Sequence, residues 1–180
     1  AFSIVPEEAF NWDAILQDAG WLHITGITPA LSGNAFRSTL KAVEAASAEG
    51  VPVSCDLNFR KKLWRWDPSK TSRELARDCM PQLLPHVSVV IGNEEDASDV
   101  LGIEAVGSNI HRGELAIDHY PKVATAIMNQ FPNVGKVAIT LRQSLSASHN
   151  NWGAMLCPRE GKACFAPTSK DGSYAPYTIK

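Results

Sequence analysis

Three polar side chains stand at alternate positions where an apolar, β-rich run ends: Asp56, Asn58 and Arg60, in the stretch CDLNFRKKLW (residues 55–64). Because the side chains of a strand point alternately to its two faces, we expect these three to share one face. An arginine at such a place is a natural bidentate partner for a carboxylate or a phosphate. The alternative is that Asp56 and Arg60 pair with each other, or with helix ends, and only close the loop. The spacing leaves both interpretations open.

A second polar group follows another apolar run, in the stretch GNEED (residues 92–96). Asn93, Glu95 and Asp96 could hold water molecules around a Mg²⁺ ion beside a phosphate, because magnesium prefers oxygen ligands and keeps much of its water. Asn-x-x-Asp is also a capping pattern at the start of a helix, and acidic residues in the first turn suit the helix dipole. From the residues alone, the helix cap is the favoured interpretation.

A third polar group follows Leu141, where a β-rich run over residues 136–141 ends. Its members carry hydroxyl, amide and basic groups: Arg142, Gln143, Ser144, Ser146, Ser148 and His149. A loop of this composition after a strand can wrap a phosphate. Surface loops often have the same composition, so the pattern decides little by itself. The chain contains no G-x-G-x-x-G fingerprint of a dinucleotide site.

The elements that must position these groups alternate between strands and helices. Short β-rich runs predict strands at residues 21–27, 51–58, 87–93 and 136–141. Between them, helical patterns are found at residues 34–49, after a capping box of Thr71 and Glu74, from Asn93 to Leu101, and at residues 121–131. This alternation indicates parallel strands joined by crossover helices, hence an α/β fold with an open sheet covered on both faces.

Three further expectations complete this arrangement. Pro81 is expected to interrupt the helix that begins at the capping box, and residues 102–120 are expected to form a loop insertion. The stretches WGAMLCP and KACFAP are expected to form an antiparallel hairpin that turns near Gly161, at one edge of the sheet. In an open parallel sheet, ligands gather at the carboxyl ends of the strands, which is where the polar groups lie.

Length and composition narrow the class of protein. The chain has 180 residues, a net charge of −2 and 20% charged residues, so we expect a single domain over residues 1–180. This charge offers no basic surface for nucleic acid, and no apolar run is long enough to span a membrane, so neither partner is expected. The four cysteines form no C-x-x-C pair, which favours reduced thiols and a cytoplasmic protein.

Taken in order, the stretches CDLNFRKKLW, VVIGNEEDA and TLRQSLSASHNNW resemble the ribokinase-like (PfkB) carbohydrate kinases, and within them the 2-keto-3-deoxygluconate kinases. HITGITPALS (residues 23–32) is similar to the same branch, and the resemblance covers essentially the whole chain. It implies part of a ribokinase-like three-layer αβα sandwich with a mostly parallel sheet. It also implies phosphorylation of a small keto-sugar acid, with ATP and Mg²⁺ as cofactors.

In this family a D-x-N-x-R motif lines the sugar site, and Asp56, Asn58 and Arg60 match it. The resemblance therefore implies that Arg60 faces the acid group of the substrate. Asn58 and Asp56 would support it. A neutral sugar would have no use for a guanidinium group at this position, so Arg60 is the residue that distinguishes an acid substrate from other sugars.

The resemblance also gives roles to the residues near the phosphates. Asn93 belongs to the family's Asn-x-x-Glu motif, in which Asp96 replaces the glutamate; Asp96 and Glu95 are expected to act on the metal through water. Thr140 and Arg142 match the nucleotide loop, with Arg142 in the place where many members have glycine. Asn93, Thr140 and Arg142 are thus the expected nucleotide- and phosphate-binding residues.

Members of the family are roughly twice as long as this chain, in line with large α/β domains. Nothing here matches the family's glycine-rich loop, so the catalytic-base aspartate is expected beyond Lys180 and the chain is expected to be an internal fragment without kinase activity of its own. The alternatives are another ribokinase-like sugar or nucleoside kinase, and a non-catalytic sugar- or nucleotide-binding module. Whether the full-length protein forms homo-oligomers is left open by the sequence.

Overall fold

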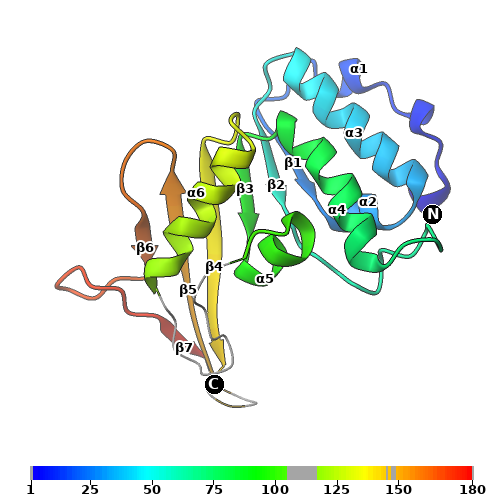
Figure 1. Ribbon diagram of the computed structural model, residues 1–180. Coiled ribbons are helices and arrows are strands. Elements are labelled where there is room, and N and C mark those ends of the chain that lie inside the picture. The colour runs from blue at the N-terminus through cyan, green and yellow to red at the C-terminus, as the bar shows by residue number, and fades with distance from the viewer. Residues whose placement is uncertain (1, 105–116, 145, 147–148, 180) are drawn as a thin grey trace.

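The computed structural model describes residues 2–104, 117–144, 146 and 149–179. They contain one sheet of seven strands (Figure 1). Four parallel strands are neighbours in sequence order: β1 (Leu22–Thr25), β2 (Val53–Asp56), β3 (Val89–Gly92) and β4 (Lys136–Ser144). β5 (Asn150–Pro158) runs antiparallel to β4, and its other edge carries β6 (Cys164–Ala166) and β7 (Tyr177–Ile179). The expected antiparallel hairpin is therefore confirmed.

The helices are α1 (Trp12–Leu16), α2 (Ile27–Ala30), α3 (Gly33–Ala48), α4 (Ser72–Leu83), α5 (Glu94–Asp96) and α6 (Tyr120–Gln130). A π-helical turn, η4 (Ala97–Leu101), continues α5 and ends at Gly102 in the left-handed conformation. Short 3₁₀ turns are η1 (Phe2–Ile4), η2 (Glu7–Ala9), η3 (Leu84–His86) and η6 (Ile117–His119). None of the helices in the described ranges has the length and apolar character needed to cross a membrane.

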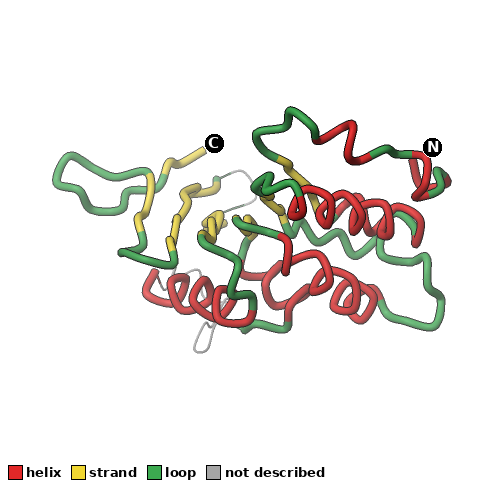
Figure 2. Tube along the Cα trace, turned by 90° about the horizontal axis from the view of Figure 1, so that it is seen from above, coloured by secondary structure: helices red, strands yellow, loops and turns green. Residues whose placement is uncertain are grey.

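One face of the parallel strands is sealed by helices. The register aligns Ile24, Cys55, Val90 and Val137 in a row across β1 to β4, and these side chains are at most 9% exposed. β1 to β4 are added to the sheet in one direction, and the crossovers between such parallel strands are right-handed, so their helices lie on the same face of the sheet. Figure 2 shows α3, α4 and α6 along one side of the strands. The described residues thus form the sheet and a helical layer on one face, so the expected cover on both faces is seen for one face in this part of the chain.

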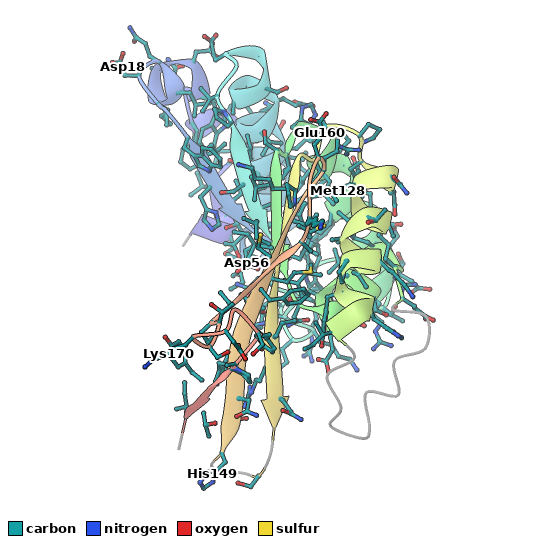
Figure 3. The ribbon with its side chains drawn as sticks, turned by 90° about the vertical axis from the view of Figure 1, so that its left-hand side faces the viewer. Asp18, Asp56, Met128, His149, Glu160 and Lys170 are labelled. Carbon is teal, nitrogen blue, oxygen red and sulfur yellow. The ribbon has the colours of Figure 1, made fainter. Side chains whose placement is uncertain are left out.

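The opposite face carries the next row of side chains. Thr25, Asp56, Ile91 and Ala138 are aligned across the same four strands, and each is half-buried. The polar Asp56 of the sequence pattern therefore lies on the less covered face, at the carboxyl end of β2. Figure 3 places Asp56 in the middle of the molecule, well away from His149 at the tip of the β4–β5 hairpin.

Helix α4 tests two predictions, the capping box at its start and the interruption at Pro81. Thr71 and Glu74 form the predicted capping box, with the Thr71 N–H donating to Glu74 Oε2 at 2.8 Å. The predicted interruption at Pro81 is wrong, because α4 continues to Leu83. Its buried side chains, Leu75, Ala76, Cys79, Met80 and Leu83, outweigh the single backbone hydrogen bond that a proline removes.

Two further expectations concern loops. The strand that was expected to end at Leu141 continues to Ser144 as part of β4, so Arg142 lies in a strand and not in a loop. The predicted loop insertion at residues 102–120 falls mostly on residues 105–116, outside the described part of the chain, as does Ser148. A single domain over residues 1–180 stays a prediction.

Candidate functional site

The carboxyl ends of β1, β2 and β3 are joined by backbone hydrogen bonds just beyond the strands. The Gly26 N–H donates to the Asp56 carbonyl at 2.8 Å, and the Leu57 N–H donates to the Ile91 carbonyl at 2.8 Å. These bonds hold the loop after β2 between its two neighbours. The loop carries Asn58 and Arg60, so the predicted sugar-site residues do meet at the expected edge of the sheet.

Asn58 does not continue the alternation of the strand. Its φ of 39° lies in the left-handed region, which asparagine tolerates better than most residues. Its side-chain amide turns back toward β1, where Nδ2 donates to the Thr25 hydroxyl at 3.1 Å. The same hydroxyl accepts the Ile27 N–H at 3.4 Å. Thr25 therefore belongs to the site; it was not among the predicted site residues, although it lies inside the strand predicted at residues 21–27 and ends β1.

Arg60 is exposed, and its guanidinium donates from Nη1 to the Phe59 carbonyl at 3.1 Å. Within the described residues it forms no ion pair with Asp56, so the interpretation of a simple Asp56–Arg60 pair is not realised. Burial raises the pKa of both Asp56 and Asp96, and the positive charge of Arg60 opposes this rise to a smaller extent. A guanidinium that is solvent-accessible and not paired can accept an anionic ligand.

Burial raises the pKa of Asp56 above its ordinary value, and this effect is larger than the opposing ones. A hydrogen bond from the Asn58 backbone lowers the pKa, as do His23 and Arg60. His23 lies on β1 with Nδ1 at 2.8 Å from the Ser54 hydroxyl. His23 is therefore a strand residue whose ring nitrogen has a hydrogen-bond partner on the neighbouring strand.

Asn93 and Asp96 form a reciprocal helix cap at the start of α5. The Asp96 N–H donates to Asn93 Oδ1 at 2.7 Å, and the Asn93 N–H donates to Asp96 Oδ2 at 3.2 Å. The second carboxylate oxygen, Oδ1, accepts the Phe59 N–H at 2.9 Å. The helix-cap interpretation of the GNEED stretch is thus confirmed, and Asp96 makes one contact that the sequence did not indicate.

The described residues build no direct site for Mg²⁺ around Asp96 and Glu95, and the expected action of these two residues through water stays a prediction. Asp96 is 7% exposed, and each of its carboxylate oxygens already accepts a backbone N–H. Glu95 is exposed to solvent on the same short helix. No cluster of three or more potential metal ligands is found among the described residues. We therefore derive no step of a reaction through a metal at this position.

The two β4 residues of the expected nucleotide loop lie at different distances from the site. The Thr140 hydroxyl donates to the Gly92 carbonyl at 3.4 Å, which places it beside Asn93. Arg142 lies two residues further along β4, roughly 7 Å at the usual rise of a strand. Its guanidinium stacks 5.1 Å from the centre of the Trp152 ring and donates to Asn150 Oδ1.

A pocket of about 180 Å³ lies beside β1 and α3. Thr25 lines it together with Thr28, Trp12 and Ser38, so it adjoins the site at the Thr25 hydroxyl. Among the described residues, neither the Ser38 hydroxyl nor the Trp12 indole N–H has a hydrogen-bond partner, although both atoms are buried. The remainder of the lining is largely apolar.

Comparison with known proteins gives this arrangement a context. A crystal structure of 2-dehydro-3-deoxygluconokinase from Thermotoga maritima has a TM-score of 0.80 and 35% sequence identity; the match covers 98% of this chain and 46% of that one. A PfkB family carbohydrate kinase from Listeria grayi has a TM-score of 0.71 and 26% identity, over 94% of this chain and 44% of that one.

The chain has the ribokinase-like fold of PfkB carbohydrate kinases. A curated 2-dehydro-3-deoxygalactonokinase from Haloferax volcanii is 37% identical over 90 residues, 50% of this chain and 26% of that protein. No family model matches the sequence. The ribokinase-like chain spans less than half the length of the two solved sugar kinases that it resembles. The predicted α/β fold class and the predicted resemblance to PfkB carbohydrate kinases are confirmed.

Proposed function

We propose that this chain forms the part of a PfkB carbohydrate kinase that binds the acid group of a 2-keto-3-deoxy sugar acid, which the complete protein phosphorylates with ATP. The observation that carries the proposal is the exposed Arg60 guanidinium at the carboxyl ends of the parallel strands, next to Asp56 and Asn58. The names of two relatives, a gluconokinase and a galactonokinase of 2-dehydro-3-deoxy acids, support the same substrate class.

Each residue has a part in this proposal. Arg60 forms a charge-assisted, bidentate contact with the substrate carboxylate. Asn58, fixed by Thr25, and Asp56 offer an amide and a carboxylate to the substrate hydroxyls. Asn93 follows β3 directly, and the exposed Thr140 donates its hydroxyl to the carbonyl of Gly92 at the end of β3. In the proposal these two residues face the phosphate side of the site.

ATP as the phosphoryl donor belongs to the proposal as well. A fold neighbour from E. coli was solved in complex with ATP and Mg²⁺. Magnesium, when bound beside the phosphates, supplies charge neutralisation during phosphoryl transfer. The described residues do not themselves build its site, so this chain contributes binding and orientation of the sugar acid. The four free cysteines support the cytoplasmic location that we propose for the complete protein.

The test uses the protein encoded by the complete gene and compares KM and kcat for 2-keto-3-deoxygluconate. Arg60→Gln removes the charge and is expected to raise KM about tenfold to a hundredfold, because hydrogen bonds to a charged group contribute roughly 1.5–3 kcal/mol. Arg65→Gln removes an exposed positive charge from the same loop and serves as the matched control. Equal KM values for the wild type and Arg60→Gln would refute the acid-binding role.

A neutral sugar of the same length separates the main proposal from the alternative of another ribokinase-like kinase. If Arg60 binds the acid group, Arg60→Gln raises the KM for the sugar acid. The KM for a neutral sugar that the enzyme also accepts as a substrate stays unchanged. A preference of the wild type for a neutral sugar favours the alternative. The 180-residue chain alone is expected to show no turnover of ATP and the sugar acid; sustained turnover would contradict the view that it is one part of the enzyme.

A further inference from the structure

The Asp96 carboxylate joins two segments that are distant in sequence. Its Oδ2 closes the helix cap with the Asn93 N–H at 3.2 Å, which is a local contact. Its Oδ1 accepts the Phe59 N–H at 2.9 Å, across 37 positions of sequence. Phe59 lies between Asn58 and Arg60. The carboxylate therefore connects the start of α5 to the loop that carries the proposed substrate residues.

The surroundings of Asp96 show why the contact is strong. The residue is 7% exposed, so its carboxylate depends on hydrogen bonds from the protein for its stability. Burial raises the pKa of Asp96, while the N–H groups of Phe59 and Asn93 and the charge of Arg60 lower it. Asp56 lies near enough to raise it further. Asp56, Asp96 and Arg60 are thus electrostatically coupled at one place.

The loop after β2 needs such a contact. Asn58 adopts a φ of 39°, and its side chain is turned toward Thr25, so the chain direction changes sharply before Arg60. On the near side, the loop is held by the bond from Leu57 N–H to the Ile91 carbonyl. On the far side, the Leu63 N–H donates to the Arg60 carbonyl at 2.8 Å. Between these two bonds, the Phe59–Asp96 bond is the contact that ties the backbone to the next strand end.

We propose that Asp96 is a positioning residue that holds the Arg60 loop over the carboxyl ends of the strands, and that it is not a member of a water-mediated magnesium network. The activity readouts of this inference rest on the proposed function. The structural readout, hydrogen exchange at Phe59, does not. Glutamate at this position would move the carboxylate by one methylene group, so a single carboxylate would no longer span both the cap and the loop.

The test uses two variants of the protein encoded by the complete gene. Asp96→Asn keeps the size but can offer only one accepting oxygen, so one backbone N–H loses its partner. Asp96→Glu keeps the charge but changes the reach. For positioning, both variants raise KM for the sugar acid about tenfold or more, with the Mg²⁺ concentration for half-maximal rate unchanged. For a metal role, Asp96→Glu preserves the Mg²⁺ dependence while Asp96→Asn shifts it and lowers kcat.

A double-mutant cycle makes the inference sharper. If Asp96 acts through Arg60, Asp96→Asn raises the KM for the sugar acid by a smaller factor in the Arg60→Gln variant than in the wild type. The reason is that both substitutions then disrupt the same contact with the substrate. Independent, additive effects on KM would overturn the inference. Asp18→Asn is the matched control, since it removes an exposed acid that Figure 3 shows far from Asp56.

Amide hydrogen exchange separates failure of this inference from failure of the proposed function. Asp96→Asn is expected to accelerate exchange of the Phe59 amide at least tenfold in the absence of any ligand, while amides in α6 keep their wild-type rates. Unchanged exchange at Phe59 in a folded variant would overturn the positioning role, whatever the substrate. Accelerated exchange with no activity on sugar acids would retain this role and reject the proposed substrate class.

Discussion

The Asn58 side-chain amide donates to the Thr25 hydroxyl at 3.1 Å, and so connects the loop after β2 to the end of β1. The two residues are 33 positions apart, and the backbone of Asn58 has a positive φ. A single residue thus satisfies a backbone requirement and a long-range contact together. The shape of the proposed sugar site depends on both.

Replacing Asn58 should therefore reveal two separate contributions to stability. Asn58→Ala removes the hydrogen bond and replaces asparagine by a residue that tolerates the left-handed region less well, and we expect a loss of about 2 kcal/mol in the free energy of unfolding. Asn58→Gly loses the bond but adopts the backbone freely, so about half of that loss is expected. Urea denaturation of both variants measures the difference. Equal losses would show that the backbone conformation contributes nothing.

Gly26 lies where the end of β1 and the loop after β2 approach closely. A Cβ built at this position would lie 2.0 Å from the Leu57 carbonyl oxygen, an atom that cannot rotate away. Gly26→Ala should therefore displace the loop after β2 and lower the free energy of unfolding by about 3 kcal/mol. Gly20→Ala is the control, because nothing lies within 4 Å of a Cβ there. A Gly26→Ala variant as stable as the Gly20→Ala variant would mean that the backbones can separate at little cost.

Ser38 presents a buried hydroxyl to the pocket beside β1. It is 1% exposed, and its Oγ has no partner among the described residues. Ser38→Ala should raise the free energy of unfolding by roughly 1 kcal/mol, since it removes an unsatisfied polar group and favours the helix. Ser47→Ala, at an exposed position of the same helix, reports the helix propensity alone. A smaller gain at Ser38 than at Ser47 would indicate that the hydroxyl is hydrogen-bonded, for example to water.

Glu7 links the N-terminal turn η2 to helix α3. Lys41 and Arg37 both contact its carboxylate, at 3.1 Å and 2.5 Å, and their hydrogen bonds and charges lower its pKa below 4.5. Because the pKa is lower in the folded state, the contribution to stability is present above pH 4.5 and is lost as the pH falls through the folded pKa.

The measurement for Glu7 is unfolding by urea at neutral pH and near pH 3, for the wild type and Glu7→Gln. The wild type should be the more stable protein at neutral pH, and the two should converge in acid. Added salt should reduce the difference, because the contact is exposed. A difference that stays constant between the two pH values would rule out the ionic contribution. Glu8→Gln, at the exposed neighbouring position, serves as the control.

The sequence predicted the parallel strands and the edge at which the polar residues meet, because both follow from short-range patterns. Alternation failed after Asp56, where the strand ends and Asn58 takes a positive φ. A period of two holds only while the backbone stays extended. The contact of Asp96 with Phe59 could not be predicted either, since it joins positions whose distance depends on the register of β2 with β3.

The prediction for Arg142 was also limited by the position at which a strand ends. Its position after Leu141 indicated a phosphate loop, but β4 continues, and the side chain lies against Trp152 on the antiparallel partner. The residues of β5 were visible in the sequence; their register with β4 was not. Nothing in the order of residues gave the length of the hairpin. The role of Arg142 in binding a nucleotide stays a prediction.

The row formed by Thr25, Asp56, Ile91 and Ala138 has a consequence for how such a protein can evolve and assemble. These side chains mix apolar surface with site residues on the same half-buried face. Any element that shields the isoleucine and alanine from water must also border the threonine and aspartate. Substitutions in such an element would therefore alter solubility and ligand selectivity at the same time, and selection could not tune either property alone.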